Sequence, residues 1–470
     1  MKEIEFDVVV IGGGSGGTPG ANLLAKKGLK VALVEKGRGL GGTCLFEGCI
    51  PSKIYIESAS RYNMLHEMKD FGIEGSFDFK VDFRKIKSRK EEILKARTER
   101  ASKGAAKNHL NVFYGLAKIS GPDTVDVNGK DGDLRLKFKK LIMATGSEGV
   151  RIPIKGNDLC LSVEDIFELE EKPESMVVIG GGYIGVEMAS MFRRVDTKVT
   201  IIELLPRLLS TEDVNVSIAV AEGLQNSGID IHVNSKVISV EKSDDGFAVR
   251  YSENGEEKVA YGQKVLMAAG RKPRTDGIDL GMLGIEKGKR GEIPVNDYMQ
   301  TINEDVYAPG DVNGKLMLAH AATVESLTAA YKILGKDVEI NYNAIPHAIF
   351  SDPESSSVGI DSTKGKEMGY EVFRYPYSED AKALIMGDKK GFVQFVVEPQ
   401  SHKLMGAQIV GKEASELIAG PTQVIKMNGT IEDITSCVYT HPTLSEVVFE
   451  AAESALSLLG KKQVAKTEKL

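Results

Sequence analysis

The amino-acid sequence predicts an α/β protein with two copies of one strand–turn–helix–strand unit and a separate C-terminal α+β domain. An internal duplication is the first observation that predicts it. Residues 8–35 (VVVIGGGSGGTPGANLLAKKGLKVALVE) align without a gap on residues 176–203 (MVVIGGGYIGVEMASMFRRVDTKVTIIE). The second is a change of pattern at Ile345, after which short alternating strands such as FVQFVVE and LMGAQIVG precede helices. The third is the length of 470 residues, which suggests about three domains.

In each copy of the duplicated unit, an apolar strand leads into a G-x-G-x-x-G turn, a helix and a second strand that ends in a glutamate. The first glycine allows a tight turn, the second lets the backbone approach a pyrophosphate, and the third packs the helix against the strand. The helix N-terminus offers N–H groups to phosphates, and the glutamate can accept hydrogen bonds from ribose hydroxyls. The pattern predicts two Rossmann-like dinucleotide-binding domains, with Gly12, Gly14, Gly17 and Glu35 in the first and Gly180, Gly182, Gly185 and Glu203 in the second.

Other segments predict the elements around these units. Residues 83–104 predict a long charged helix with a solvated face, and residues 317–334 predict another helix. Three apolar strands that each enter a glycine turn are expected at residues 139–147, 265–275 and 306–312.

Composition argues against some classes of function. The formal net charge of −7, from 60 basic and 67 acidic residues, argues against nucleic acid as the main partner, which would require a concentrated basic field. The N-terminal residues lack the apolar core and cleavage site of a signal peptide, and no run of about 18 apolar residues predicts a membrane span. We therefore expect a cytosolic protein, and structural disulfides are uncommon in the cytosol.

The segment GGTCLFEGCIPSK places Cys44 and Cys49 close together where a helix is predicted to begin. A structural disulfide here would close a ring of six residues, for which loop entropy contributes only roughly 2 kcal/mol. A structural zinc site needs four ligands in close pairs, and Cys160 and Cys437 are isolated, so we expect no metal. A redox-active pair fits better, because the helix dipole and Lys53 would stabilise a thiolate.

Two dinucleotide sites and a redox-active cysteine pair suit a flavin that carries electrons between a nicotinamide and a disulfide. The chain resembles the flavoprotein disulfide reductases of the pyridine nucleotide-disulfide oxidoreductase family and is most similar to the dihydrolipoamide dehydrogenases. The similarity follows the whole chain in order, through both glycine turns, GGTCLFEGCIPSK, ATGS, AAGRKPRT, APGDV, SDPESSSVG and HPTLSE. It implies a homodimer that oxidises dihydrolipoamide with NAD by way of FAD and the Cys44–Cys49 pair.

The resemblance also implies the domain order and the cofactor contacts. The expected domains are an FAD-binding domain at residues 1–148, an NAD-binding domain at 149–270, a return to the FAD-binding domain at 271–342 and a C-terminal interface domain for dimerisation at 343–470. The first glycine unit is thereby assigned to FAD and the second to NAD. Further cofactor contacts are expected from Thr145, Gly146, Gly270 and Asp311, and Asp311 would hold the ribityl chain of FAD unless it merely caps a turn.

Catalytic roles also follow from the resemblance. Cys44, the first cysteine of the pair, would exchange with the substrate disulfide, and Cys49 would face the flavin and form the charge-transfer thiolate. His441 and Glu446 match the base and the carboxylate that orients it, and they would reach the cysteines of the other subunit. Histidine suits this proton transfer because it titrates near neutral pH. Lys53 and Glu187 match an ion pair beside the flavin, and Tyr183 would shield the flavin or simply pack.

The choice of nicotinamide can be argued from chemistry. Glu203 stands where an acid would bind the 2′-hydroxyl of NAD and repel the 2′-phosphate of NADP. Arg207 alone is weak evidence for NADP, so we expect NAD.

Phe46, Glu47, Tyr439 and Thr440 depart from the usual family pattern on the substrate side, so they bear on the identity of the substrate. One alternative is a reductase of glutathione, another low-molecular-weight thiol or coenzyme A disulfide. Mercuric reductase is another, although the tail GKKQVAKTEKL lacks the C-terminal cysteine pair of that family. A flavin-binding protein without catalysis is the third. The sequence carries no lipoyl domain, so any 2-oxoacid dehydrogenase complex must supply the lipoyl arm in trans, and a lipoyl-bearing acyltransferase of such a complex is the expected partner.

Overall fold

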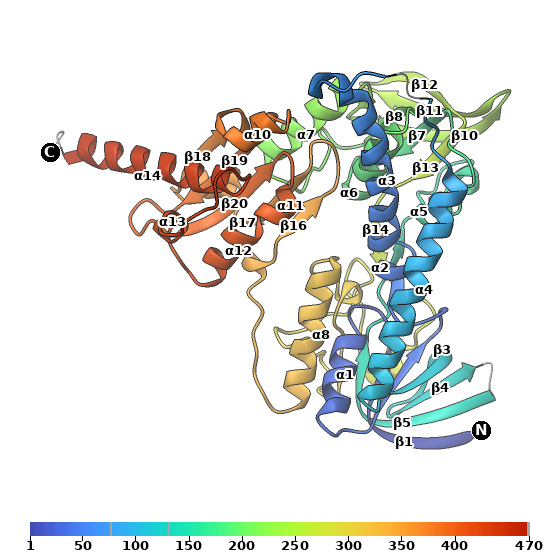
Figure 1. Ribbon diagram of the computed structural model, residues 1–470. Coiled ribbons are helices and arrows are strands. Elements are labelled where there is room, and N and C mark those ends of the chain that lie inside the picture. Colours follow the sequence, from blue (N-terminus) through green and yellow to red (C-terminus); the bar gives the residue numbers. More distant parts are fainter. Residues whose placement is uncertain (76–77, 130–131, 468–470) are drawn as a thin grey trace.

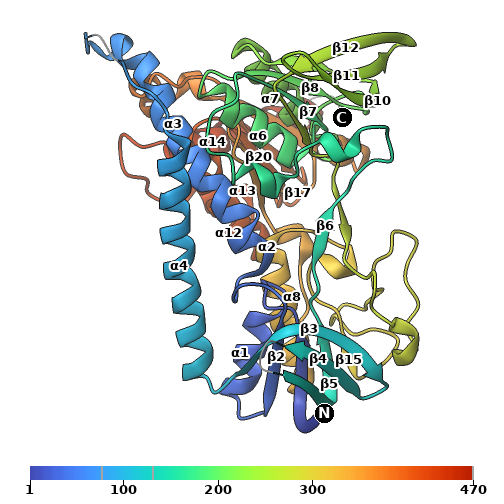
Figure 2. The ribbon, with the colours of Figure 1, turned by 90° about the vertical axis from the view of Figure 1, so that its right-hand side faces the viewer.

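The computed structural model describes residues 1–75, 78–129 and 132–467, so the last three residues of the expected C-terminal domain lie outside it. Within the described residues, a mixed sheet and a parallel sheet carry the duplicated units, and an antiparallel sheet forms the C-terminal region (Figures 1 and 2). The predicted α/β class with a C-terminal α+β domain is confirmed. Among these residues, no helix combines the length and the apolar character that a bilayer crossing requires.

The first sheet has the strand order β1-β2-β3-β4-β5-β15, and β1 also pairs with β5. Its strands are β1 (Lys2–Ile11), β2 (Val31–Glu35), β3 (Asn111–Gly121), β4 (Thr124–Gly129), β5 (Gly132–Met143) and β15 (Val306–Tyr307). Val8 and Val10 face helices α1 (Thr18–Lys26) and α8 (Ala319–Ile333), while Val9 faces the opposite core. The apolar run of β1 is therefore buried on both faces, as is usual for parallel strands.

The parallel sheet has the strand order β13-β7-β8-β9. Its strands are β7 (Ser175–Ile179), β8 (Lys198–Ile202), β9 (Asp230–His232) and β13 (Lys264–Met267), and α6 (Tyr183–Arg193) and α7 (Val214–Asn226) connect them. An antiparallel meander of β10 (Ser235–Ser243), β11 (Gly246–Glu253) and β12 (Glu256–Gly262) adjoins it. The chain leaves the first sheet through β6 (Ser147–Gly149), after which α5 (Val163–Ile166) precedes β7, and it returns through β14 (Arg271–Pro273), which pairs with β6.

The C-terminal sheet has the strand order β16-β17-β20-β19-β18. Its strands are β16 (His347–Ile349), β17 (Ser355–Gly359), β18 (Glu371–Pro376), β19 (Phe392–Val397) and β20 (Leu404–Val410). The helices around it are α9 (Ser362–Glu367), α10 (Ala381–Ile385), α11 (Ala414–Leu417), α12 (Ala419–Lys426), α13 (Ile431–Thr435) and α14 (Glu446–Thr467). Every residue of β19 is buried, which the alternating pattern did not predict. Gln394 is tolerated there because its amide bonds Asp213 and Gln408.

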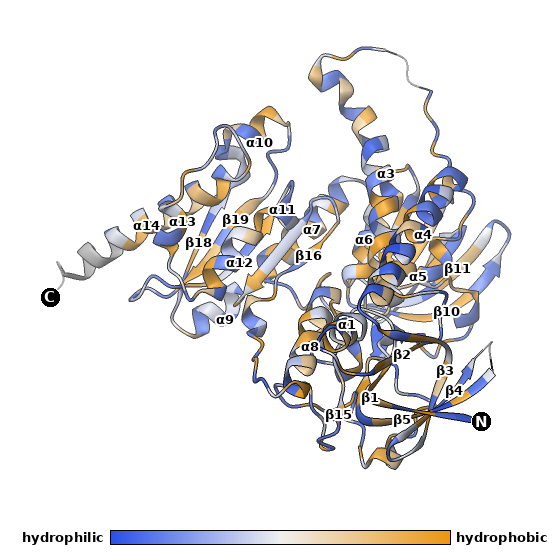
Figure 3. Cartoon of the chain, turned by 60° about the horizontal axis from the view of Figure 1, so that its bottom comes forward, coloured by the Kyte–Doolittle hydropathy of each residue, from blue (hydrophilic) through white to orange (hydrophobic). Residues whose placement is uncertain are grey.

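Three helices carry the region around the cysteines: α2 (Gly42–Phe46), α3 (Cys49–Glu67) and α4 (Phe83–Lys107). Hydrophilic residues lie along much of α4 (Figure 3). Phe83, Ile86 and Leu94 are nevertheless buried, and so is Lys90, whose ammonium group donates to the carbonyl of Phe167. The predicted solvated face of α4 is therefore present, and the opposite face of the helix is buried. Hydrophobic periodicity alone does not reveal the buried face, because the buried Lys90 counts as a hydrophilic residue in the sequence.

Candidate active site

The loop that holds the cysteines packs directly on the first glycine turn. The N–H of Gly41 donates to the carbonyl of Gly13 at 2.8 Å, and a Cβ on Gly42 would lie 2.7 Å from the Cα of Gly14. Gly42 also has a φ of +58°, which favours glycine. The two glycines before the first cysteine are therefore required for this close approach, and they bring Cys44 beside the first turn.

The two thiols of the pair are chemically unequal. Both are free, with Cys44 in α2 and Cys49 as the first residue of α3, after Gly48. The hydrogen bond from the Cys44 thiol lowers the pKa of Cys49 to about 7, and the charge of Lys53 contributes, although desolvation opposes both. The same hydrogen bond, followed by burial, raises the pKa of Cys44. Cys49 therefore loses its proton near neutral pH, while Cys44 keeps its proton.

An ion pair from two helices lies one turn beyond Cys49. The Lys53 ammonium is 3.0 and 2.9 Å from the two carboxylate oxygens of Glu187, which comes from α6. Glu187 also accepts the N–H of Phe350 at 3.1 Å, and the Lys53 ammonium lies 4.2 Å from the centre of the Phe350 ring. The structure thus brings together Lys53 and Glu187, which the sequence analysis paired, and adds Phe350, which it missed. Phe350 directly precedes the SDPESSSVG motif, and that position is the one signal that could have indicated it.

The predicted glycines of the two turns differ in the space around them. A Cβ at Gly12 would lie 2.1 Å from the carbonyl oxygen of Ala144, so only glycine fits the tight turn. A Cβ at Gly182 would meet no atom within 4 Å, and at Gly14 the nearest atom would be 3.6 Å away. The open side of Gly182 fits the approach of a pyrophosphate, whereas a Cβ at Gly14 would lie in van der Waals contact with the Cα of Gly42.

The two acids have equivalent environments. The Glu35 carboxylate accepts the N–H groups of Gly13 and Gly37, each at 2.6 Å. The Glu203 carboxylate likewise accepts the N–H groups of Gly181 and Leu205. Each carboxylate is thus held beside its own turn, and its remaining lone pairs suit ribose hydroxyls.

Segments far apart in the chain meet at the opposite side of the first turn. Gly16 lies so close to Pro309 that a Cβ would be 2.8 Å from its carbonyl oxygen, which brings Asp311 to the turn. The hydroxyl of Ser147 donates to Asp311 at 2.5 Å and accepts from Arg271 at 2.8 Å. The sequence did not indicate Ser147 and Arg271 as site residues, although Ser147 lies in the motif ATGS and Arg271 lies in AAGRKPRT. The remaining predicted residues lie here as well: Thr145 donates to the carbonyl of Arg274 at 2.7 Å, and Gly146 and Gly270 have φ of +75° and +106° with no atom within 4 Å of a built Cβ.

His441 and Glu446 form a pair at the start of α14. The Nδ1 of His441 is 2.9 Å from a carboxylate oxygen of Glu446, and the other oxygen accepts the N–H of Thr443 at 2.8 Å. The hydrogen bond from Thr443 and then the one from His441 lower the pKa of Glu446. The His441 side chain is 73% exposed, and α13 and α14 lie on the far side of the chain from α2 and α3 (Figure 1). Within one chain, the helix that begins at Glu446 therefore lies apart from the two helices that carry the cysteines.

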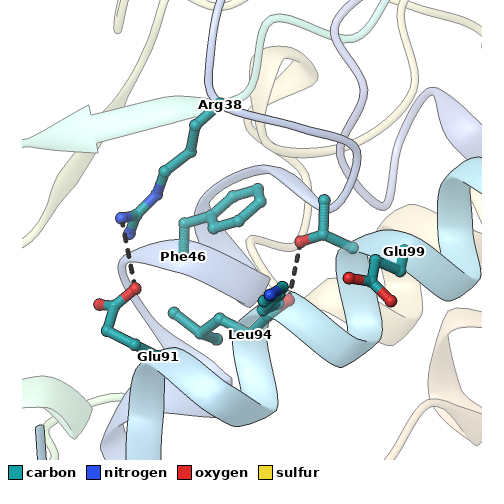
Figure 4. Close-up of a pocket in the computed structure, with 7 residues that line it drawn as sticks. Arg38, Phe46, Glu91, Leu94 and Glu99 are labelled. Atoms are coloured by element: carbon teal, nitrogen blue, oxygen red, sulfur yellow. Dashed lines mark hydrogen bonds and ion pairs between the residues drawn. The ribbon is translucent and has the colours of Figure 1, made fainter. Parts of the chain in front are cut away.

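A shallow pocket of about 230 Å³ lies between the cysteine loop and α4 (Figure 4). The guanidinium of Arg38 lies 5.0 Å from the centre of the Phe46 ring and 3.9 Å from Glu91. Phe46, one of the departures from the family pattern, therefore forms a wall of this pocket. The full lining is Arg38, Phe46, Glu91, Leu94, Lys95, Thr98 and Glu99.

Comparison with known proteins covers nearly the whole chain. Residues 6–326 match the pyridine nucleotide-disulphide oxidoreductase family model, and residues 345–452 match the dimerisation domain of that family. The chain is 36% identical to the dihydrolipoyl dehydrogenase of Geobacillus stearothermophilus, across 96% of this chain and 97% of the relative. It is 37% identical to the dihydrolipoyl dehydrogenase of Haloferax volcanii, across 96% of each chain.

Solved structures resemble the same fold. The HOCl-induced flavoprotein disulfide reductase RclA from Escherichia coli superposes with a TM-score of 0.84 at 26% identity, covering 95% of this chain and 99% of that one. LpdA from Mycobacterium tuberculosis superposes with a TM-score of 0.88 across 97% of this chain and all of that one, and at 23% identity it supports the fold alone.

Proposed function

The chain belongs to the pyridine nucleotide-disulphide oxidoreductase family, and from this premise we propose that it is a dihydrolipoyl dehydrogenase, which oxidises dihydrolipoamide to lipoamide with NAD. The observation that carries the proposal is the pair of unequal thiols, in which Cys49 lies beside Lys53 and loses its proton near neutral pH while Cys44 keeps its proton. Such a pair can accept two electrons from a dithiol and hold them ready for a second acceptor. Curated relatives of that name, at 33 to 37% identity over 96% of the chain, support the choice of substrate.

FAD and NAD are the cofactors of this enzyme. The first glycine turn with Glu35 fits FAD, as do Asp311 and Ser147, and the second turn with Glu203 fits NAD. Open space beside Gly182 supports the assignment of the second turn, because a pyrophosphate must approach the backbone there. When bound, FAD carries an electron pair from the dithiol to NAD, which accepts it as a hydride.

Cys44 and Cys49 would carry out the thiol–disulfide exchange, and His441 would transfer the protons. A thiol of dihydrolipoamide loses its proton to His441 and attacks the Cys44 sulfur, forming a mixed disulfide while the Cys44–Cys49 bond breaks. Cys49 leaves as a thiolate, stabilised by Lys53 and the start of α3. The second substrate thiol then loses its proton and attacks the first substrate sulfur, which closes the lipoamide ring and releases Cys44, and Cys44 takes up a proton from His441. Two electrons have passed from substrate to the cysteine pair, and the other proton goes to solvent.

We place this active site at the interface of a homodimer. The C-terminal region matches a dimerisation domain, and within one chain α14, which begins at Glu446, lies apart from α2 and α3. Met427 and Val438, which are 79% and 99% exposed, are apolar surface near His441 in the chain and suit burial against a second copy. A second copy would supply its His441 to the cysteines of the first.

NAD is expected to be preferred over NADP, with kcat/KM higher by about a hundredfold in dihydrolipoamide oxidation. The buried Glu203 would face the 2′-phosphate of NADP with a like charge. Arg207 is directed elsewhere, because its guanidinium donates to the carbonyls of Leu209, Ser210 and Glu212. Steady-state kinetics with both nucleotides checks this, and Glu203→Ser should narrow the preference while Arg207→Lys should leave it in place. A higher kcat/KM with NADP would contradict the assignment.

Dihydrolipoamide is expected to be the best substrate by at least about tenfold in kcat/KM over other disulfide couples. The experiment compares NAD reduction by dihydrolipoamide with reduction of glutathione disulfide, coenzyme A disulfide and Hg(II) by NADH. Dominant turnover of one of the three rival substrates would replace the proposed substrate. No turnover with any of the four compounds would favour a protein without catalysis. A lipoyl-bearing acyltransferase of a 2-oxoacid dehydrogenase complex in the cytosol would be the physiological source of the dithiol.

A further inference from the structure

A buried carboxylate that has no role in the mechanism above joins the second glycine turn to the C-terminal sheet. The side chain of Glu212 is 1% exposed. It accepts the hydroxyl of Tyr183 on one oxygen and the hydroxyl of Ser357 on the other, the latter at 2.8 Å. The Nε2 of His347 lies 2.8 and 3.0 Å from its two oxygens. The start of α6, the loop that holds Glu212 and the paired strands β16 and β17 therefore meet at one carboxylate.

The charge states of this cluster set the direction of its hydrogen bonds. Burial raises the pKa of Glu212, but the hydrogen bonds from His347, Tyr183 and Ser357 together hold it below its ordinary value. Burial and the charge of Glu212 raise the pKa of Tyr183. Tyr183 therefore stays protonated and donates to a carboxylate, and hydrogen bonds to charged groups are among the stronger ones.

The position of Tyr183 relates this cluster to the nicotinamide. Tyr183 is the first residue of α6, and Glu187 lies one turn later on the same face of the helix. Strand β16 runs along that face, since the ring of His347 stacks on Tyr183 with centres 6.1 Å apart and Phe350 bonds Glu187. A dinucleotide whose pyrophosphate binds at the start of α6 must pass this face to bring its nicotinamide to the Lys53–Glu187 pair. The Tyr183 ring therefore lies in its path.

We propose that Glu212 is a positioning residue that, braced by His347 and Ser357, fastens Tyr183 across the nicotinamide path, so that NAD(H) must break the Tyr183–Glu212 hydrogen bond to bind. The proposal rests on the assignment of the second glycine turn to NAD. It makes NAD(H) affinity depend on two residues of the C-terminal sheet, His347 and Ser357, which lie outside the nucleotide-binding domain.

The test is the Tyr183→Phe variant of the holoenzyme, which keeps the ring and removes only the hydroxyl. Isothermal titration calorimetry should show a Kd for NAD lower than that of the wild type by at least about fivefold, because binding no longer breaks a charge-assisted hydrogen bond. The KM for NADH in ferricyanide reduction should fall similarly, while kcat changes by less than about threefold. Glu212→Gln, which keeps an acceptor for Tyr183 but no charge, should give a smaller decrease of the Kd.

Asn215→Ala is the matched control. Asn215 lies on α7 and bonds Gln394 of the C-terminal sheet at 2.8 Å, so its loss weakens the contact between the domains without touching Tyr183. An unchanged Kd in this variant is expected. A Kd for Tyr183→Phe equal to or higher than the wild-type value would overturn the proposal, as would an equal effect of Asn215→Ala. The ferricyanide assay uses no dithiol, so a wrong substrate assignment leaves this result standing, whereas failure of the wild type to bind NAD(H) would overturn both proposals.

Discussion

Replacement of Cys49 by serine is expected to lower kcat for dihydrolipoamide oxidation by more than about a thousandfold. Serine keeps the size and a hydroxyl at the start of α3, but it cannot form a disulfide with Cys44. The cysteine pair then has no oxidised form to receive electrons from the substrate.

The wild-type rate of cysteine reoxidation should also rise as the pH passes about 7 and level off above, because the lowered pKa of Cys49 makes it a thiolate there.

The measurement is steady-state NAD reduction with dihydrolipoamide, at several pH values for the wild type. Cys437→Ser is the matched control, since this exposed thiol donates to the carbonyl of Asp433 and a serine hydroxyl can do the same. It should retain activity within about twofold of the wild type. Activity of Cys49→Ser above a few per cent would rule out a relay through this disulfide, and the loss of activity in Cys437→Ser would point to general damage.

Replacement of His441 by glutamine is expected to lower kcat for dihydrolipoamide oxidation by about 10²- to 10⁴-fold, the usual contribution of a general acid–base group. The amide keeps a polar group that Glu446 can bond, but it cannot take the proton of a substrate thiol. Ferricyanide reduction by NADH should stay within about twofold of the wild type, because it needs no proton transfer to a dithiol. An equal loss in both assays would mean that His441 acts only on folding.

A hybrid dimer tests which subunit's cysteines His441 serves. One subunit carries Cys49→Ser and the other carries His441→Gln, and two affinity tags isolate the mixed species. If His441 acts on the other subunit, one of the two sites has both an intact pair and an intact histidine, and the hybrid should show about half of the wild-type activity. Both parent homodimers should be inactive. A hybrid as inactive as its parents would contradict an active site shared between subunits.

Local patterns predicted much of this protein. The glycine turns were predictable because their geometry depends on residues close in sequence, and at Gly12 the structure shows a position where any side chain would strike the neighbouring strand. The helix expected at residues 83–104 is α4 (Phe83–Lys107), and the one expected at 317–334 is α8 (Ala319–Ile333), within three residues at each end. The expected pairs Lys53–Glu187 and His441–Glu446 came from the resemblance to a known family and not from local patterns.

Sequence by itself determined the two glycine turns, the cysteine pair and the order of the units, because each depends on spacing along a few neighbouring residues. The tertiary structure alone decided that Phe350 joins the Lys53–Glu187 pair, since Phe350 lies far from both residues in the chain. It also decided that Tyr183, Glu212 and His347 meet. Such contacts join segments far apart in the chain, and the packing of whole domains, which leaves no local pattern, sets them.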